Sequence, residues 1–280
     1  MTLAVVTDSS ACLPRALADS RGIEVVALHL DKETGTTSRP SVTELARAYR
    51  RAAGRADEVL AVHLSACLSG TVDNARLAAE EVNEALAGGP VTVVDTGTCS
   101  GGVGLAALAA AGAPDARRGA ALALESASRS RVLFLVPDIS HLRRGGRIDR
   151  TTALRGATLG IHPILEVRGG RIVVAETVRG AARARRHLMA RAVRAAGGSA
   201  LNGPRPPAVP VRLAVHDAGA AAAAQELEDE LAEAMAASGA VLTSVLRSHA
   251  DPALAAHVGP GALGVVVAPA LGAVDDPLQA

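Results

Sequence analysis

A repeat of apolar strand, polar turn and helix through its first part constrains the fold of this chain more than any other feature. The predicted strands are LAVVTDSS (3–10), IEVVALHL (23–30), DEVLAVHL (57–64) and PVTVVDTGTCS (90–100). A short helix is predicted after Pro14, and a second over 42–53 with Ser41 as its N-cap. Further helices are predicted over 71–88, ending at Gly88, and over 104–112. This alternation is typical of a parallel sheet with helices on both faces.

The pattern changes after residue 128. A strand and a short helix lead into a glycine turn, and a further helix is expected over 151–160. Two strands flank Gly169-Gly170, the signature of a hairpin. A helix and a Pro/Gly-rich surface loop over 199–210 follow, and strands with one Ala/Glu-rich helix complete a mixed half.

The length of the chain favours two domains over one, because 280 residues exceed the usual size of a single domain. We therefore expect an α/β protein with an N-terminal domain over 1–128, built on a parallel sheet with helices on both faces. A C-terminal mixed α+β sandwich is expected over 129–280.

Composition excludes several classes of partner. The 29 basic and 28 acidic residues balance, and one Tyr, one Phe and no Trp leave few stacking surfaces, so we expect no nucleic acid partner. Three cysteines without close pairing favour a reducing compartment, and no run is long enough to span a membrane. The apolar start is too short for a signal peptide. We expect a cytoplasmic protein without integral membrane insertion.

Polar side chains follow three of the predicted strands. Asp8-Ser9-Ser10, Ser65 to Thr71, and Asp95-Thr96-Gly97-Thr98 each lie between a strand and a helix. Taken singly, each segment reads as an ordinary helix N-cap. Because ends of parallel strands share one edge of the sheet, the three together favour a shared polar site for an anion.

Two motifs that suggest an enzyme are weak. GVGLAA (102–107) matches the dinucleotide fingerprint in letters, but its turn is too long and no acidic residue follows at the required distance. A phosphate-binding loop of the G-x-x-x-x-G-K-[ST] type is missing from the sequence, so we expect no cofactor and no binding of ATP alone. Cys67 as a nucleophile would need a base, such as His63, and a small core-facing thiol is the simpler interpretation.

The second half offers cationic and imidazole candidates. Arg147 lies in LRRGGRIDR around a Gly-Gly turn, and Arg179 lies at a strand end; each suits an anion or a partner, and equally a solvated surface. His257 precedes Gly259-Pro260-Gly261, a turn in which the backbone can pass close to a ligand. Its imidazole could donate to an oxyanion, or be an ordinary packed histidine.

Taken together, these motifs resemble the DegV family. The resemblance runs through TDSSACLP (7–14), TTSRPS (36–41), HLSACLSGT (63–71), VVDTGT (93–98), LRRGGRI (142–148), IHPIL (161–165), ETVRG (176–180) and HVGPGALGV (257–265). It implies a two-domain DegV-like fold that buries one long-chain fatty acid between its halves. It also implies that the protein is not itself an enzyme. A separate ATP-dependent fatty acid kinase would receive the carboxyl group and form an acyl-phosphate for phospholipid synthesis.

The resemblance also implies roles for single residues. Ser65, Thr96 and His257 are the expected carboxylate contacts, and Arg147 and Arg179 are expected near the partner-facing surface. The remaining headgroup shell comprises Asp8, Ser9, Ser10, Ser69, Gly70, Thr71, Gly97, Thr98, Gly259 and Gly261.

Three departures from the family pattern bear on specificity. Val72 stands where Tyr is common, His162 where Lys is common, and TTSRPS replaces a TSQPS pattern. These affect chain-length preference and kinase pairing more than lipid binding itself. Two alternative functions remain open: a stand-alone acyl hydrolase using Cys67 or a serine, and a regulatory module that senses a lipid.

Overall fold

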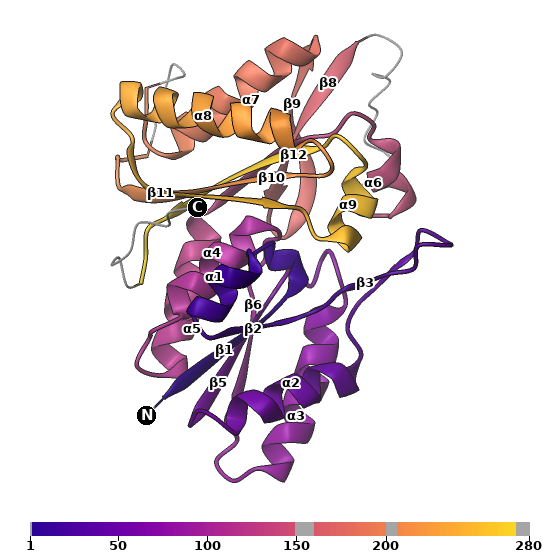
Figure 1. Ribbon diagram of the computed structural model, residues 1–280, viewed down its shortest axis with the longest axis vertical. Helices are drawn as coiled ribbons and strands as arrows, with labels where there is room; N and C mark the ends of the chain where they lie inside the picture. Colours follow the sequence, from indigo (N-terminus) through magenta and orange to yellow (C-terminus); the bar gives the residue numbers. More distant parts are fainter. Residues whose placement is uncertain (1, 149–159, 200–205, 273–280) are drawn as a thin grey trace. The chain divides into compact units, whose positions relative to one another are not determined.

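The computed structural model describes residues 2–148, 160–199 and 206–272, which divide into two compact units. Among the described residues, the first unit runs through Arg129 and includes Asp251–Ala253 and residues 271–272, and the second comprises the remainder. The helix expected over 151–160, except for Gly160, lies outside the described residues, and so does the part of the loop expected over 199–210 that spans 200–205. Each unit is described by itself below, and Figure 1 labels its elements.

The first unit is built on a parallel sheet in the order β2-β1-β5-β6. Its strands are β1 (Leu3–Asp8), β2 (Ile23–Val26), β5 (Glu58–His63) and β6 (Val91–Asp95). The short helices η1 (Ser9–Ala11) and α1 (Arg15–Ser20) follow β1. The expected parallel sheet is confirmed, and its strands are mostly β-branched runs, as buried parallel strands require.

Helices cover both faces of this sheet (Figure 1). α2 (Val42–Ala53) and α3 (Thr71–Ala85) pack against each other on one face, and α4 (Gly101–Ala110) and α5 (Ala116–Arg129) do so on the other. The core beneath α2 and α3 combines Leu45 and Tyr49 with alternate residues of β1 and β5. α2 begins at a capping box, in which Ser41 and Glu44 exchange side-chain and backbone hydrogen bonds.

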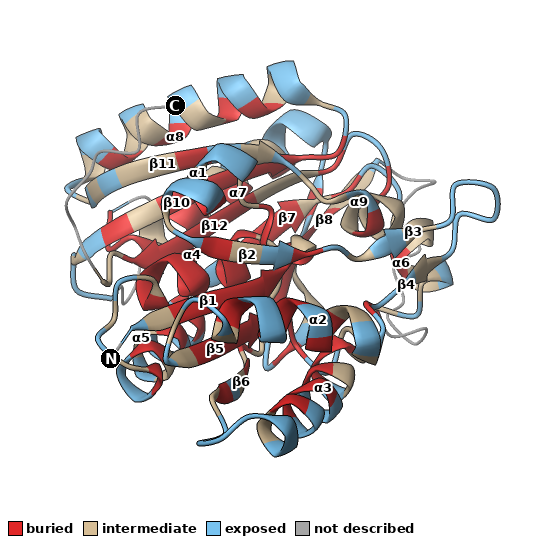
Figure 2. Ribbon diagram, turned by 60° about the horizontal axis from the view of Figure 1, so that its bottom comes forward, coloured by how far each residue is buried: buried red, intermediate tan, exposed pale blue. Residues whose placement is uncertain are grey.

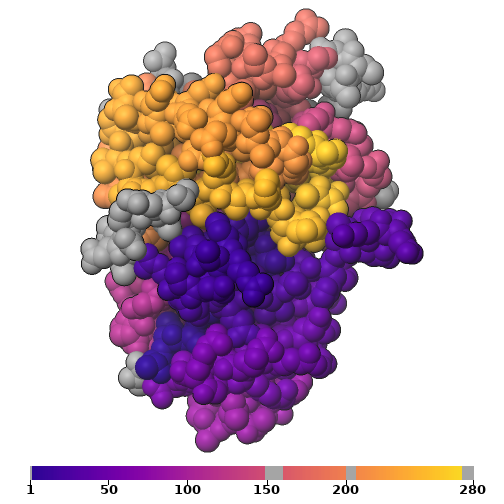
Figure 3. All heavy atoms as spheres, in the orientation of Figure 1, coloured from indigo at the N-terminus to yellow at the C-terminus, as the bar shows by residue number. Residues whose placement is uncertain are grey.

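The predicted strand over 23–30 is broken in the structure. β2 ends at Val26, and β3 (His29–Leu30) pairs antiparallel with β4 (Thr37–Ser38) in a separate ribbon. One cause is a bond from the Leu28 amide to the Ser9 hydroxyl, which takes this donor out of the ladder. In the space-filling view the indigo atoms of this ribbon protrude from the unit (Figure 3).

The second unit is built on a mixed sheet in the order β11-β10-β12-β7-β8-β9. β10 and β11 are parallel, and the other neighbours are antiparallel. Its strands are β7 (Arg131–Leu135), β8 (Ile161–Arg168), β9 (Arg171–Arg179), β10 (Pro210–Asp217), β11 (Val241–His249) and β12 (Leu263–Pro269). Its helices are α6 (Ser140–Arg144), α7 (Ala181–Ala195), α8 (Ala221–Ser238) and α9 (Pro252–Val258).

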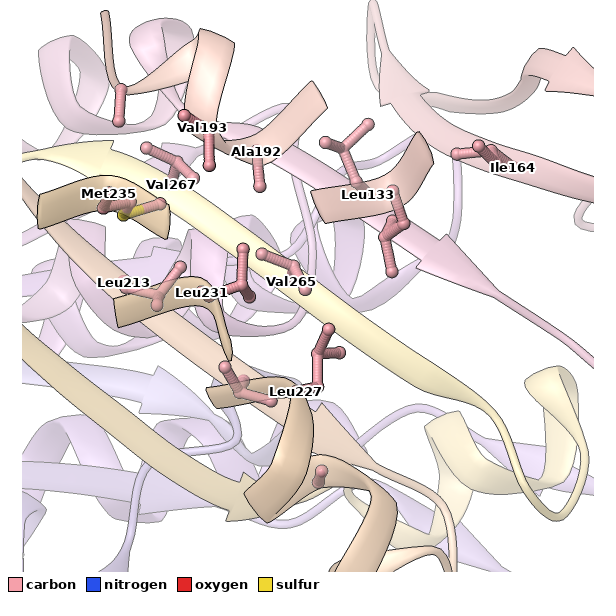
Figure 4. Packing of buried hydrophobic residues seen from close by; sticks show 14 of the residues in the cluster. Leu133, Ile164, Ala192, Val193, Leu213, Leu227, Leu231, Met235, Val265 and Val267 are labelled. Carbon is pink, nitrogen blue, oxygen red and sulfur yellow. The ribbon is translucent and has the colours of Figure 1, made fainter. Parts of the chain in front are cut away.

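Helices α7 and α8 pack on one face of this mixed sheet. Figure 4 shows Leu227, Leu231 and Met235 of α8 meeting Leu213 of β10 and Val265 of β12. The opposite side of α8 is exposed, as the burial colours of Figure 2 show. Burial of these side chains stabilises the unit by roughly 1.5–3 kcal/mol each, which is why the two helices are held to the sheet.

The hairpin predicted around Gly169-Gly170 is confirmed. Arg168 and Arg171 are cross-strand partners, and both glycines have positive φ, 56° and 76°. A two-residue turn with left-handed backbone at both positions matches the twist of the flanking strands. In the described parts of the chain, no helix is both long and apolar enough to cross a membrane.

Candidate functional site

The polar segments after β1, β5 and β6 meet at the carboxyl edge of the parallel sheet of the first unit. The Ser65 amide donates to the Thr98 carbonyl (2.8 Å), and the Thr96 amide donates to the His63 carbonyl (3.1 Å). The Ala66 amide lies 3.3 Å from an Asp95 carboxylate oxygen. These bonds join segments about thirty residues apart in the sequence. The loops after β5 and β6 therefore lie together at one edge of the sheet, as the order of strands and helices predicted.

Asp8 forms the base of this edge. Its buried carboxylate accepts the Leu64 amide (3.1 Å) and the Ser10 amide (3.1 Å), and also the Ser10 hydroxyl. His63 Nδ1 lies 2.8 Å from the same carboxylate. Asp8 and Ser10, both expected in the headgroup shell, are therefore engaged with the protein itself, and their observed contacts position the loop after β5.

His63 is held on both sides of its ring. A carboxylate can only accept, so Nδ1 carries the proton that bonds Asp8, and the Tyr49 hydroxyl lies 2.8 Å from Nε2. All three side chains are buried, and burial raises the pKa of the Tyr49 phenol above its usual range. We call this set the Tyr49–His63–Asp8 network. Sequence inspection missed it, because Tyr49 lies in an amphipathic helix and resembles any core aromatic.

The arrangement of His63 argues against a Cys67 nucleophile. Both ring nitrogens of His63 are taken by the network, so this imidazole has no free nitrogen to accept a thiol proton. Cys67 is exposed, and its amide donates to the Ser65 hydroxyl oxygen (3.2 Å). Cys67 therefore stabilises the loop through its backbone amide.

Hydroxyl groups line the rest of the loop that precedes α3. The amides of Leu68 and Ser69 donate to the Ser65 carbonyl (2.9 and 3.1 Å), which closes a tight turn around Ser65. The hydroxyls of Ser69 and Thr71 lie 2.9 Å apart. Gly70 is the N-cap of α3 and supplies no side-chain cap. The loop therefore presents several hydroxyl groups and unclaimed amides at the start of a long helix.

Thr96 and Thr98 differ in what their hydroxyls offer. The Thr96 hydroxyl donates to the His63 carbonyl (2.8 Å) and accepts the Thr98 amide (3.3 Å). The Thr98 hydroxyl has no hydrogen bond to another described residue. Gly97 between them has φ 60°, a left-handed backbone that favours glycine. In this conformation Thr98 is the better placed of the two to donate.

The segment 36–41 joins this edge, and the sequence analysis named none of its residues as site residues. The Asn74 side-chain amide donates to the carbonyl of buried Pro40 (2.8 Å). A Cβ added to Gly70 would lie 1.6 Å from Nη1 of Arg39, so the guanidinium rests on the Gly70 backbone. The sequence did hold a signal for this contact. Arg39 stands where the family pattern has Gln, but the sequence analysis gave this departure no role in the site.

The GVGLAA segment lies inside α4, which begins at Gly101. A Cβ at Gly104 would approach the Ala11 carbonyl to 2.4 Å, so this glycine allows α4 to pack against the segment after β1. The glycines here serve helix packing. Among the described residues, no group of three or more His, Cys, Asp or Glu side chains could hold a metal ion.

In the second unit, glycines bring two imidazoles close to the backbone. A Cβ at Gly145 would lie 2.4 Å from His257 Nδ1, and one at Gly259 would lie 2.7 Å from the His141 ring. Gly259 and Gly261 have φ 81° and 82°. The LRRGGRI and HVGPG motifs therefore pack against each other through their glycines. The sequence analysis did not recognise that His257 lies on a helix, because α9 (Pro252–Val258) is only seven residues long.

Burial, together with the positive charge of Arg147, lowers the pKa of His257 to about 4. The imidazole is therefore neutral at physiological pH, with one N–H to donate. Arg147 is half-buried and donates to the Gly145 carbonyl. Arg179 is exposed at the end of β9, opposite Ile161. Of the two arginines expected to face a partner, Arg147 lies near His257 and Arg179 lies on the surface of its unit.

A further buried polar group lies at the end of β10. His216 Nδ1 lies 2.9 Å from the Ser248 hydroxyl, while its Nε2 has no partner among the described residues. Burial lowers the pKa of His216 to about 4. The next residue, Asp217, accepts the Ala220 amide (2.7 Å) and bonds His249 (2.9 Å). Neither histidine was a candidate at the level of the sequence.

The units define a class: an α/β protein with hydroxyl-rich loops at the carboxyl edge of a parallel sheet, and a second, mixed sheet covered on one face by helices. The family described as "Uncharacterised protein, DegV family" matches residues 29–270. The chain belongs to the DegV family.

Individual relatives agree with this assignment. A DegV domain-containing protein of Streptomyces coelicolor is 36% identical over 95% of this chain and 98% of its own length. The crystal structure of a DegV family protein from Corynebacterium glutamicum superposes with a TM-score of 0.82 at 33% identity, covering 98% of this chain and 100% of that one. The structure of a DegV family protein from Thermus thermophilus is described as showing fatty acid binding. It superposes with a TM-score of 0.80 at 31% identity, covering 96% of this chain and 100% of that one.

Proposed function

We propose that this protein binds one long-chain fatty acid through its carboxyl group, and that it has no catalytic activity of its own. The observation that carries the proposal is the gathering of hydroxyl-bearing loops at one edge of the first unit. The fatty acid binding stated for the Thermus thermophilus relative gives this polar edge a ligand class. The long-chain acid is the ligand, and the proposal includes no other cofactor.

Each unit contributes its own proposed carboxylate contacts. In the first unit they are the hydroxyls of Ser65 and Thr96, and in the second the neutral imidazole of His257. Thr96 would have to release the His63 carbonyl in order to donate, whereas the Thr98 hydroxyl is already available. We therefore place Thr98 beside Ser65 as a contact of the first unit. Ser9, Ser69, Gly70, Thr71, Gly97, Gly259 and Gly261 complete the proposed headgroup shell.

The acyl chain would supply most of the binding free energy. Each buried methylene is worth roughly 0.8 kcal/mol, so a chain of about 16 carbons offers on the order of 10 kcal/mol before ordering costs. The headgroup contacts then fix orientation. This division of labour suits a protein that must hold a lipid while leaving its carboxyl group reactive.

We propose further that the bound acid is presented to a separate ATP-dependent kinase in the cytoplasm. The kinase would transfer the γ-phosphoryl group of ATP to the carboxylate, which gives an acyl-phosphate for phospholipid synthesis and releases ADP. The sequence has no phosphate-binding loop of the G-x-x-x-x-G-K-[ST] type, which supports a division between carrier and kinase. Arg179, and Arg147 beside His257, are the proposed partner-facing cations. With such a kinase, Arg179→Ala should slow acyl-phosphate formation while palmitate binding stays unchanged.

The binding proposal is tested by native mass spectrometry and lipid extraction, followed by titration of the delipidated protein with palmitate. We expect one fatty acid per chain, and a loss of affinity of roughly tenfold or more in Ser65→Ala, because a hydrogen bond to a charged group is lost. Ser128→Ala on α5 is the matched control, since its hydroxyl only donates to the Glu125 carbonyl. A protein that neither carries nor takes up a fatty acid overturns the proposal.

The same titration separates the two threonines. Thr98→Val should weaken palmitate binding more than Thr96→Val if the observed hydrogen bonds persist in the complex. The reverse order would assign the contact to Thr96 and require its hydroxyl to leave the His63 carbonyl on binding.

A further inference from the structure

Arg39 is held in place at the hydroxyl-rich edge of the first unit. Its Nη1 and Cζ lie 1.6 and 2.7 Å from the point that a Cβ of residue 70 would occupy, so the guanidinium needs glycine there. Gly70 lies between Ser69 and Thr71, whose hydroxyls contact each other. The backbone next to Arg39 is anchored, because Pro40 is buried and its carbonyl accepts the Asn74 amide. The side chain thus lies over the loop that contains Ser65.

No carboxylate of the described residues pairs with the positive charge of Arg39. Among the described residues, Arg39 has no ion-pair partner and no hydrogen bond. The carboxylate nearest in sequence, Glu44, is taken by Ser41 and His29. Hydrogen bonds to Ser41 lower the pKa of Glu44 to about 2, so it is ionised and engaged.

Three other exposed arginines of this unit pair with carboxylates. Arg50 pairs with Glu81, and Arg51 and Arg55 both pair with Glu24. Arg39 differs from these three because its guanidinium rests on a glycine beside hydroxyl groups and has no counter-ion among the described residues. Hydroxyl groups can donate to a neutral ester or alcohol as well as to an acid, whereas a guanidinium adds a positive charge that favours an ionised carboxylate.

We propose that Arg39 is a specificity-determining residue, which makes the headgroup site select ionised fatty acids over neutral acyl compounds. This inference rests on the proposed function, because it assigns the same site a preference for charge. Arg39 supplies the positive charge at this edge, and Gly70 leaves the space in which the guanidinium lies.

The test compares affinities for palmitate and for 1-hexadecanol at pH 8, where the acid is ionised and the alcohol is neutral. In Arg39→Gln we expect palmitate binding to weaken about tenfold and hexadecanol binding to stay unchanged, since a charge-assisted hydrogen bond is lost. Arg117→Gln is the matched control: it removes the same charge from an exposed position on α5. It should leave both affinities unchanged.

A second variant separates the position of the charge from its presence. Gly70→Ala keeps the arginine but displaces its flexible end, and φ −75° at this position accepts alanine. Gly70→Ala should reduce the preference for palmitate over hexadecanol as Arg39→Gln does. Combining the two substitutions should reduce this preference no further than Arg39→Gln alone.

Two outcomes would overturn these conclusions in distinguishable ways. If wild type binds palmitate and Arg39→Gln keeps the same preference for acid over alcohol, the role of Arg39 is wrong and the proposed function stands. If wild type binds neither compound, the proposed function fails and the assignment of Arg39 fails with it.

Discussion

At the scale of residues, the Tyr49–His63–Asp8 network sets the geometry of the candidate site. It links α2, the end of β5 and the end of β1 through buried hydrogen bonds of 2.8 Å. Asp8 also holds the Leu64 amide, one residue before Ser65. Buried polar groups are costly unless paired, so each member of the network depends on the others.

Tyr49→Phe tests this dependence. The substitution leaves His63 Nε2 buried without its partner, which costs the desolvation of that atom, about 1–3 kcal/mol. We expect the free energy of unfolding in urea to fall by this amount. His63→Phe alone should also be destabilising, and adding Tyr49→Phe to it should cost less than Tyr49→Phe costs in wild type. Equal costs in both backgrounds would show that the two side chains do not act together.

Residue roles were predictable from sequence only where their cause is local. Ser41 was expected as an N-cap from its place before an amphipathic run, and the capping box confirms this prediction. The pairing of Asp8 with His63 joins positions 55 residues apart, and no local pattern signals it. Arg39 was visible as an unusual residue, but its contact with Gly70 follows from the path of the 36–41 segment.

At the scale of elements, glycines decide how closely helices approach their neighbours. Gly104 lies in the middle of α4, where alanine would be better by intrinsic helix propensity, about 1 kcal/mol. Its position against the Ala11 carbonyl and the Leu13 side chain leaves no room for a methyl group.

Gly104→Ala therefore tests packing against propensity. We expect a loss of stability on the order of 1–3 kcal/mol, because a carbonyl oxygen of the backbone cannot move aside as a side chain can. Thermal unfolding followed by circular dichroism measures it. Gly54→Ala, at the C-cap of α2 with only ordinary contacts of 3.5 Å, is the control and should change stability little. A stabilised Gly104→Ala would mean that propensity outweighs this contact.

Elements with a strong apolar pattern or a turn signal were predictable, and most short ones were not. The strands of both sheets and the Gly169-Gly170 hairpin were expected from their apolar runs and turn residues. α5 (Ala116–Arg129) was not predicted from the sequence. The helix expected to end at Gly88 ends at Ala85, since Leu86 is already extended.

At the scale of the whole molecule, the parallel sheet of the first unit followed from the order of its elements, because parallel strands require crossover helices. The strand order of the second unit could not be predicted: β12 lies between β10 and β7, strands far apart in the chain. That pairing depends on side chains of distant segments sharing one core.

The pH dependence of unfolding is a property of the whole chain. The pKa of His216 is about 4 when folded, against 6.5 for an ordinary histidine, so between these values the unfolded chain binds the additional proton. Stability contributed by the neutral ring is present above pH 6.5 and is lost as pH falls toward 4. The expected loss is on the order of 3 kcal/mol at one site.

Urea unfolding at pH 4, 5, 6 and 7 measures this loss. His216→Gln should show a shallower dependence on pH than wild type, because glutamine does not titrate. His162→Gln, on β8, is the control, since it removes a half-buried histidine whose side chain has no hydrogen bond or ion pair with another described residue. Identical slopes for wild type and His216→Gln would contradict the assignment.

The cysteines carry a practical consequence for future work. Burial raises the pKa of Cys12 to about 11 and that of Cys99 to about 12, so both thiols stay protonated and slow to react near neutral pH. Cys67 is exposed and lies two residues from Ser65. A thiol-directed fluorophore should therefore attach at this one sulfur in the native protein and give an optical reporter beside the candidate site.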